Sequence, residues 1–259
     1  MNKKTQGYRI VYVSGLLALI GMCGTSSTYA QDEYWHQRVS LFSKLPVDTC
    51  DIVFLGNSIT DGGEFQELFG MENVLNRGIR SDRISGVLKR LDQVTDGHPK
   101  MIFLLIGIND VADSRNTAAS IAGKYEELVK TIREKTPDTQ LYVQSIMPIN
   151  NDFKRYKSLI GRESIIPDLN SRLQNIAMEA GAVYIDLWPV LADSETGKMK
   201  KDFTSDGLHL TGAGYRAWTE AVRPFVEGLL PSPANDIPDE TKASDSEDSL
   251  PISIIKVMR

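Results

Sequence analysis

Residues 101–110, MIFLLIGIND, contain the feature that decides the fold: an unbroken apolar run that ends in a glycine and polar side chains. Apolar residues at every position, rather than at every second one, are typical of a strand buried on both faces of a parallel sheet. Four further short runs rich in apolar and β-branched residues share this character, at residues 51–55, 73–75, 141–145 and 182–186. The sequence therefore predicts a parallel sheet of these five strands.

Amphipathic helical patterns separate or follow these runs. Apolar residues recur at helical spacing over residues 81–94, 118–135, 165–180 and 213–230, as they do in helices that bury one face. Strand and helix thus alternate along the chain. This order predicts a doubly wound α/β fold, a three-layer α/β/α sandwich around a five-stranded parallel sheet.

The first 30 residues differ from the rest of the chain. Three basic residues precede an uncharged apolar stretch over residues 10–22, and small residues follow up to Ala30. This arrangement is typical of a cleaved signal peptide. The apolar stretch is shorter than the roughly 20 residues that span a bilayer comfortably. We therefore expect residues 1–30 to be a signal peptide.

A retained membrane or lipid anchor is the alternative to cleavage. A lipid anchor would use Cys23, but Met22 is a poor residue immediately before a lipidated cysteine. The expected mature chain begins near Gln31 and is exported, to the periplasm or the extracellular space, without stable membrane insertion.

Residues 31–230 are long enough to form one domain with a full core. Beyond them, over residues 231–259, prolines and a run of acidic and serine residues predict a disordered tail. Loss of the signal's three positive charges would change the formal net charge from −5 to −8. An acidic balance argues against nucleic-acid binding, which usually requires a basic surface. Cys50 would remain the single cysteine, and we expect a small buried residue there rather than a reactive thiol.

Residues that can donate hydrogen bonds or attack a substrate follow three of the predicted strands. Ligands of open parallel sheets bind at the carboxyl ends of the strands. Ser58 follows the first strand in a tight turn within Gly56-Asn57-Ser58, Gly78 follows the second, and Asn109 follows the third. A hydroxyl, a close backbone N–H and a carboxamide at one edge can together serve acyl chemistry. Taken alone, each of these residues is better explained as a helix cap or a turn, and only their combination favours a catalytic site.

The motif Asp206-Gly207-Leu208-His209 stands just before the last predicted helix. Its spacing lets the carboxylate meet the imidazole across one turn, orient it and stabilise its protonated form. His36 and His98 lie in no comparable setting. Together with Ser58 and the two candidate oxyanion donors, this pair provides every role that acyl transfer requires. No metal-binding or phosphate-binding motif occurs in the sequence, so we expect neither metal nor cofactor.

These four motifs, in this order, resemble the signature blocks of the SGNH (GDSL-like) hydrolase superfamily over residues 51–230. Asn57 replaces the Asp of the common Gly-Asp-Ser pattern, as in platelet-activating-factor acetylhydrolase-like and bacterial acetylesterase branches. The resemblance implies a flavodoxin-like sheet with strand order 2-1-3-4-5. It implies a catalytic triad of Ser58 as nucleophile, His209 as base and Asp206 as the orienting carboxylate. The implied oxyanion hole comprises the N–H groups of Ser58 and Gly78 and the side-chain amide of Asn109.

The chain further resembles exported sialate and carbohydrate O-acetylesterases, which implies a small-molecule or glycan ester as substrate. Arg77 and Arg80 lie near the predicted oxyanion side and are candidates for binding the carboxylate of a sugar acid. A solvated helix start explains them equally well. Two alternative functions remain open: a lysophospholipase or thioesterase of the same superfamily, and an inactive glycan-binding module.

Overall fold

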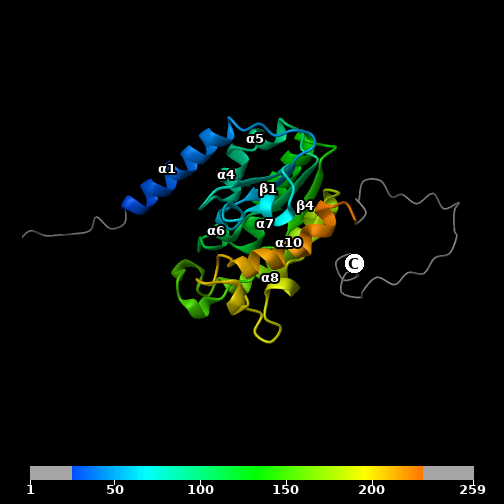
Figure 1. Ribbon diagram of the computed structural model, residues 1–259. Coiled ribbons are helices and arrows are strands. Elements are labelled where there is room, and N and C mark those ends of the chain that lie inside the picture. Colours follow the sequence, from blue (N-terminus) through cyan, green and yellow to red (C-terminus); the bar gives the residue numbers. More distant parts are fainter. Residues whose placement is uncertain (1–24, 230–259) are drawn as a thin grey trace, which may run out of the picture.

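A computed structural model describes residues 25–229, with a five-stranded sheet at its centre (Figure 1). The strands are β1 (Ile52–Gly56), β2 (Val74–Gly78), β3 (Met101–Leu105), β4 (Gln140–Gln144) and β5 (Val183–Ile185). Their order is β2-β1-β3-β4-β5, and every neighbouring pair is parallel. The predicted fold class and strand order are confirmed. Because all strands run the same way, their carboxyl ends share one edge of the sheet.

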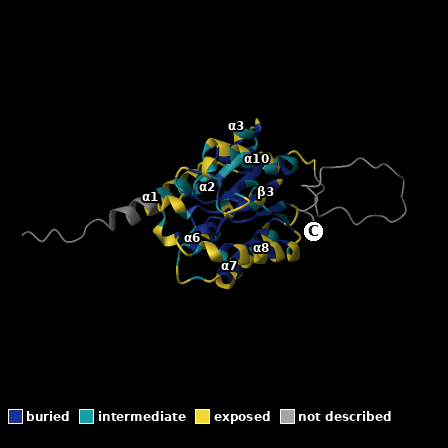
Figure 2. Cartoon of the chain, turned by 90° about the horizontal axis from the view of Figure 1, so that it is seen from below, coloured by how far each residue is buried: buried dark blue, intermediate teal, exposed yellow. Residues whose placement is uncertain are grey.

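Helices form a layer on each side of the sheet. Figure 2 shows α3 (Phe65–Phe69) and α10 (Gly212–Val226) on one side of the buried strands, and α6 (Ile108–Val111), α7 (Ala118–Lys135) and α8 (Ile166–Glu179) on the other. Contacts between α3 and α10, and between α7 and α8, hold each layer together. The remaining α-helices are α1 (Thr25–Phe42), α2 (Ser58–Asp61), α4 (Ile84–Lys89), α5 (Asp92–Thr95) and α9 (Trp188–Leu191).

The core follows the apolar pattern of the sequence. All five residues of β1 and of β3 are buried. Aromatic rings stack across the middle strands, with ring centroids 4.8 Å apart for Phe54 and Phe103 and 4.4 Å for Phe103 and Tyr142. Such pairs add to the stabilisation that burial alone provides. This packing fixes β1 and β3, and with them the loops that follow these strands.

The helix predicted over residues 81–94 is divided in the structure. α4 ends at Lys89 and α5 starts at Asp92. Arg90, between them, is 2 % exposed and pairs with the equally buried Asp82. The backbone leaves the helical conformation at Arg90, where φ is −116°. Helical spacing alone does not reveal an arginine that turns inward.

Cys50 is exposed, so the prediction that it is buried was wrong. It lies in the turn before β1, where its carbonyl accepts a hydrogen bond from the Asn73 side chain. Turn residues stay at the surface because their backbone needs water or local partners.

The two predicted terminal segments lie largely outside the described residues. The tail over residues 231–259 is wholly outside, and of the predicted signal only residues 25–30 are described, within α1. Figure 1 shows α1 leaning out from the body at its amino end. None of the helices between residues 25 and 229 is long and apolar enough to cross a lipid bilayer.

Candidate active site

Ser58, His209 and Asp206 form a chain of hydrogen bonds at the carboxyl edge of the sheet. Ser58 Oγ lies 2.9 Å from His209 Nε2, and His209 Nδ1 lies 2.8 Å from Asp206 Oδ2. Ser58 is the first residue of α2, after β1, and the other two come from the loop before α10, where His209 lies 151 residues later in the chain. These distances allow proton transfer between a hydroxyl and an imidazole that a carboxylate orients.

A tight turn places Ser58 at this edge. The Asn57 side chain caps α2 by accepting a hydrogen bond from the Ile59 N–H at 3.0 Å. A Cβ on Gly56 would lie only 2.2 Å from Thr60 Oγ1 and 2.3 Å from the Leu105 carbonyl oxygen, so only glycine fits there. The sequence alone allows Ser58 to be the helix cap, but in the structure Asn57 is the cap. The Ser58 hydroxyl instead faces the imidazole of His209.

The loop before α10 is folded around the Asp206 carboxylate. Oδ1 accepts the N–H groups of Leu208 and His209 at 2.9 Å and 2.8 Å. Oδ2 faces His209 Nδ1 and also accepts the Tyr156 hydroxyl at 2.8 Å. Partial burial opposes ionisation, but these hydrogen bonds outweigh it and lower the pKa of Asp206 to about 2. The carboxylate is therefore charged at neutral pH.

The backbone conformation at residue 207 explains why the motif Asp206-Gly207-Leu208-His209 contains a glycine. Its φ is +88°, a conformation that other residues adopt only with strain. A Cβ there would lie 2.2 Å from the carbonyl oxygen of Asn150, whose own N–H donates to the Gly207 carbonyl at 2.8 Å. The glycine lets the loop cross this segment at close range.

Asn109 lies at the start of α6, directly after β3, as the sequence predicts. Its Nδ2 donates to the Asp82 carbonyl oxygen at 2.8 Å, which fixes the orientation of the amide. An amide nitrogen carries two hydrogens. One hydrogen of Asn109 is used in this bond, and the second is left for another acceptor.

Gly78 has a different role from the predicted one. Its N–H donates to Asn76 Oδ1 at 2.7 Å, so this hydrogen is already used. A Cβ at Gly78 would lie 2.1 Å from the backbone nitrogen of Asp61. Gly78 is needed because β2 packs tightly against α2, and its assignment to the oxyanion hole is corrected.

Arg77 lines a groove between α1 and β2, but most of its side chain is buried and bonded within the fold. It is 5 % exposed, and its guanidinium donates to the carbonyl oxygens of Asn76 and Leu45 and lies over the Phe42 ring. Arg80 differs, because its side chain is 68 % exposed. It forms an ion pair with Asp61 at 3.0 Å and leaves part of its guanidinium open to solvent.

The comparison with known proteins assigns this arrangement to a family. The family model described as the GDSL-like Lipase/Acylhydrolase family matches residues 54–217. The chain belongs to this family. Its neighbours in that family are lipases and acylhydrolases, and this chain is a carboxylic ester hydrolase with their α/β fold.

Individual relatives of this GDSL-like hydrolase share its fold at low identity. The rat platelet-activating factor acetylhydrolase IB subunit alpha2 is 26 % identical over 191 residues, covering 70 % of this chain and 77 % of the relative. A solved structure from Streptococcus pneumonia, named for platelet activating factor, has a TM-score of 0.71 at 27 % identity, covering 78 % of this chain and 96 % of the other. An acetylxylan esterase from Geobacillus stearothermophilus has a TM-score of 0.56 at 16 % identity, covering 68 % and 94 %.

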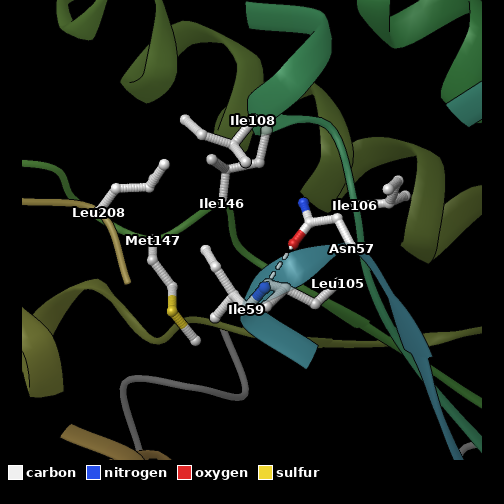
Figure 3. A pocket seen from close by; sticks show the side chains of 8 residues that line it. All are labelled: Asn57, Ile59, Leu105, Ile106, Ile108, Ile146, Met147 and Leu208. Carbon is white, nitrogen blue, oxygen red and sulfur yellow. Dashed lines mark hydrogen bonds between the residues drawn. The ribbon is translucent and has the colours of Figure 1, made fainter. Parts of the chain in front are cut away.

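Buried residues of the GDSL-like hydrolase enclose a small apolar cavity (Figure 3). Three of its lining residues, Ile59, Ile108 and Leu208, are direct sequence neighbours of Ser58, Asn109 and His209. The other lining residues are Asn57, Leu105, Ile106, Ile146 and Met147. The cavity volume is about 10 Å³, roughly the room that one water-sized group needs.

A larger and more polar groove of about 630 Å³ lies between α1 and β2. Tyr34, Asp61 and Arg80 contribute to its wall. The Tyr34 hydroxyl donates to Asp61 at 2.9 Å, and Arg80 lies over the Tyr34 ring. The N-terminal helix therefore forms one side of this groove.

The sequence did not reveal two groups at this site. Tyr156 contacts both Asp206 and His209 from an irregular segment, for which periodicity gives no signal. Trp35 of α1 donates to Asp82 at 3.3 Å, the residue whose carbonyl holds Asn109. Among residues 25–229, no group of three or more His, Cys, Asp or Glu side chains is arranged to hold a metal ion.

Proposed function

We propose that this GDSL-like hydrolase cleaves short-chain acyl esters, mainly O-acetyl esters of carbohydrates, through an acyl-enzyme on Ser58. One observation carries the proposal: Ser58 Oγ lies 2.9 Å from His209 Nε2, and His209 Nδ1 lies 2.8 Å from Asp206. This chain of bonds is the arrangement that activates a serine for attack on an ester.

The proposed reaction has two steps. His209 takes the proton from Ser58 as Oγ attacks the ester carbonyl, and it returns that proton to the leaving alcohol when the C–O bond breaks. Water then attacks the acyl-enzyme while His209 again accepts and returns a proton, which releases the acid and restores Ser58. The charged Asp206 stabilises the imidazolium in both steps.

The oxyanion of each tetrahedral intermediate needs hydrogen-bond donors. Ser58 N–H and the second hydrogen of the Asn109 amide are proposed for this role. A third donor is the N–H of Ser81, for which none of the residues from 25 to 229 provides an acceptor. Ser81 has a φ of +63°, a conformation that is rare outside glycine and clusters at functional sites. Removal of one such donor commonly lowers turnover by about 10²–10³-fold.

The small cavity supports a preference for acetyl groups. Ile59, Ile108 and Leu208 are the sequence neighbours of Ser58, Asn109 and His209, and Met147 also lines the cavity. A volume of about 10 Å³ is at the lower limit for one water-sized group, so this cavity has no room for a long acyl chain. Two similar proteins carry names that refer to platelet activating factor, one of them as an acetylhydrolase.

We propose that the polar groove, whose wall includes Asp61 three residues after Ser58, binds a sugar rather than a lipid on the alcohol side. Arg80 offers exposed guanidinium hydrogens, which match a carboxylate such as that of a sialic acid. Release of acetate from O-acetylated sialic acids and from neutral xylan fragments tests this. Arg80→Ala should lower activity on the acidic sugar alone, and equal losses on both would exclude carboxylate recognition by Arg80.

The chain-length dependence of hydrolysis tests the function itself. With p-nitrophenyl esters, we expect activity on acetate, a steep fall at butyrate, and loss of all activity in Ser58→Ala. Met147→Ala should extend activity to butyrate because it enlarges the cavity. Hydrolysis that rises with chain length would instead support a lysophospholipase or thioesterase. The absence of any ester hydrolysis would support a glycan-binding module.

We also propose that the enzyme is exported. The basic and apolar pattern of residues 1–30 carries this proposal. The amino-terminal sequence of the secreted or periplasmic protein should begin near Gln31, and a chain that retains Met1 would contradict it.

A further inference from the structure

Tyr156 contacts the triad from a segment that lacks regular helices and strands. Between β4 and α8, residues 145–165 contain only the short 3₁₀ turns η1 (Asn151–Phe153), η2 (Lys157–Leu159) and η3 (Glu163–Ile165). The Tyr156 hydroxyl donates to Asp206 Oδ2 at 2.8 Å and lies 2.9 Å from His209 Nδ1. Its ring meets the imidazole edge-on, with centroids 5.6 Å apart. Tyr156 thus approaches both partners of the Asp206–His209 hydrogen bond.

This segment is fixed at both ends. Asn150 donates its N–H to Gly207 at 2.8 Å and its side-chain amide to the Met199 carbonyl at 2.9 Å. On the other side of Tyr156, the Arg162 guanidinium donates to the carbonyl oxygens of Val111 and Asn116. The phenol is therefore held against the loop that carries Asp206 by contacts that do not depend on the triad.

We propose that Tyr156 is a positioning residue, whose hydroxyl holds Asp206 Oδ2 against His209 Nδ1. The inference rests on the proposed function, because it concerns the same triad. Oδ2 accepts two hydrogen bonds, from the phenol and from the imidazole. The phenol hydrogen bond fixes the orientation of the carboxylate. It also partly neutralises the negative charge on Oδ2, which would otherwise stabilise the imidazolium more strongly.

The groups around this pair define the electrostatic setting. Ser58 faces His209 from α2, and Leu208 and His209 donate their N–H groups to Asp206 Oδ1. Arg155 is the charged neighbour that favours ionisation of the phenol. Burial first, and then the Asp206 carboxylate, outweigh it and raise the pKa of Tyr156 to about 12. The hydroxyl is therefore protonated, and a hydrogen-bond donor, at neutral pH.

The test is Tyr156→Phe, which keeps the ring and removes only the hydroxyl. With p-nitrophenyl acetate, we expect kcat/KM at neutral pH to fall about 10-fold through kcat, with KM unchanged. Without the phenol the carboxylate stabilises the imidazolium more strongly. The acid limb of the pH profile should therefore move upward by roughly half to one pH unit. The low-field NMR signal of the proton between Asp206 and His209 should shift as well.

Tyr142→Phe is the matched control, because it removes a tyrosine hydroxyl bonded at 3.0 Å to Gln140, away from the triad. It should leave the profile and the proton signal unchanged. Two results for Tyr156→Phe would overturn the inference: a profile and proton signal that match the unmodified enzyme, or a fall in activity that is equal at every pH. If the unmodified enzyme neither hydrolyses esters nor reacts at Ser58, the proposed function fails instead, and the NMR signal still tests the contact.

Discussion

At the scale of single residues, Asp206 shows how one carboxylate serves both the fold and the site. Its two oxygens accept two backbone N–H groups, an imidazole and a phenol. The backbone bonds close the loop before α10, and the side-chain bonds orient His209. The same bonds that shape the loop therefore prepare the carboxylate to stabilise an imidazolium.

This bonding makes part of the stability depend on pH. The pKa of Asp206 is lowered to about 2 in the folded protein, from about 3.9 in an unfolded chain. A lowered pKa contributes stability above the unfolded value, and this contribution is lost as the pH falls through the folded value. We expect Asp206→Asn to reduce the free energy of unfolding by about 1–2 kcal/mol at pH 6, after allowance for solvent screening.

Urea unfolding of both proteins measures this difference. The difference in the free energy of unfolding between the unmodified protein and Asp206→Asn should disappear as the pH falls from about 4 to about 2. A gap that stays constant over this range would show that the stabilisation does not come from the charge of Asp206.

At the scale of elements, a buried ion pair connects α1, the helices after β2 and the strand that carries the nucleophile. Arg90 bonds to Asp82 at 2.8 Å and to the Gly56 carbonyl at 3.1 Å, and Trp35 of α1 reaches the same carboxylate. The Asp82 carbonyl in turn fixes the Asn109 amide. The break between α4 and α5 thus lets Arg90 turn inward and complete a hydrogen-bond network that extends through Asp82 to Asn109.

Arg90→Met should destabilise the protein strongly. It leaves the buried Asp82 carboxylate without its charged partner, which typically costs about 3–5 kcal/mol. Arg172→Ala in α8 is the control, because its pair with Asp168 is largely exposed, and such pairs contribute about 0–1 kcal/mol. Urea midpoints that fall equally little in both variants would contradict the account of the Asp82–Arg90 pair.

At the scale of the whole molecule, the parts that sequence predicts best are those set by burial. The strand at 101–106 could be predicted because a position buried on both faces of a sheet selects apolar residues. The parallel direction of the strands then brings Ser58 and Asn109 to one edge. His209 and Asp206 could be added because their spacing and their motif are local properties of the chain.

The remaining features of the site depend on the direction in which individual side chains and N–H groups point. The periodicity of the sequence carries no information on these directions. The Gly78 N–H donates to Asn76 rather than to a substrate, and Arg77 bonds to Leu45 rather than facing outward. Both directions depend on how segments far apart in the chain pack against each other. Tyr156 reaches the triad from an irregular segment that is fixed by distant carbonyl oxygens. These residues are visible only once the whole chain is folded.

Covalent labelling with a fluorophosphonate tests the central claim most directly. The account predicts one adduct, on the peptide that contains Ser58, formed much more slowly in His209→Ala and not at all in Ser58→Ala. Mass spectrometry of the digested protein identifies the modified residue. An adduct on any other residue, or ester hydrolysis that continues in a Ser58→Ala protein, would contradict the account.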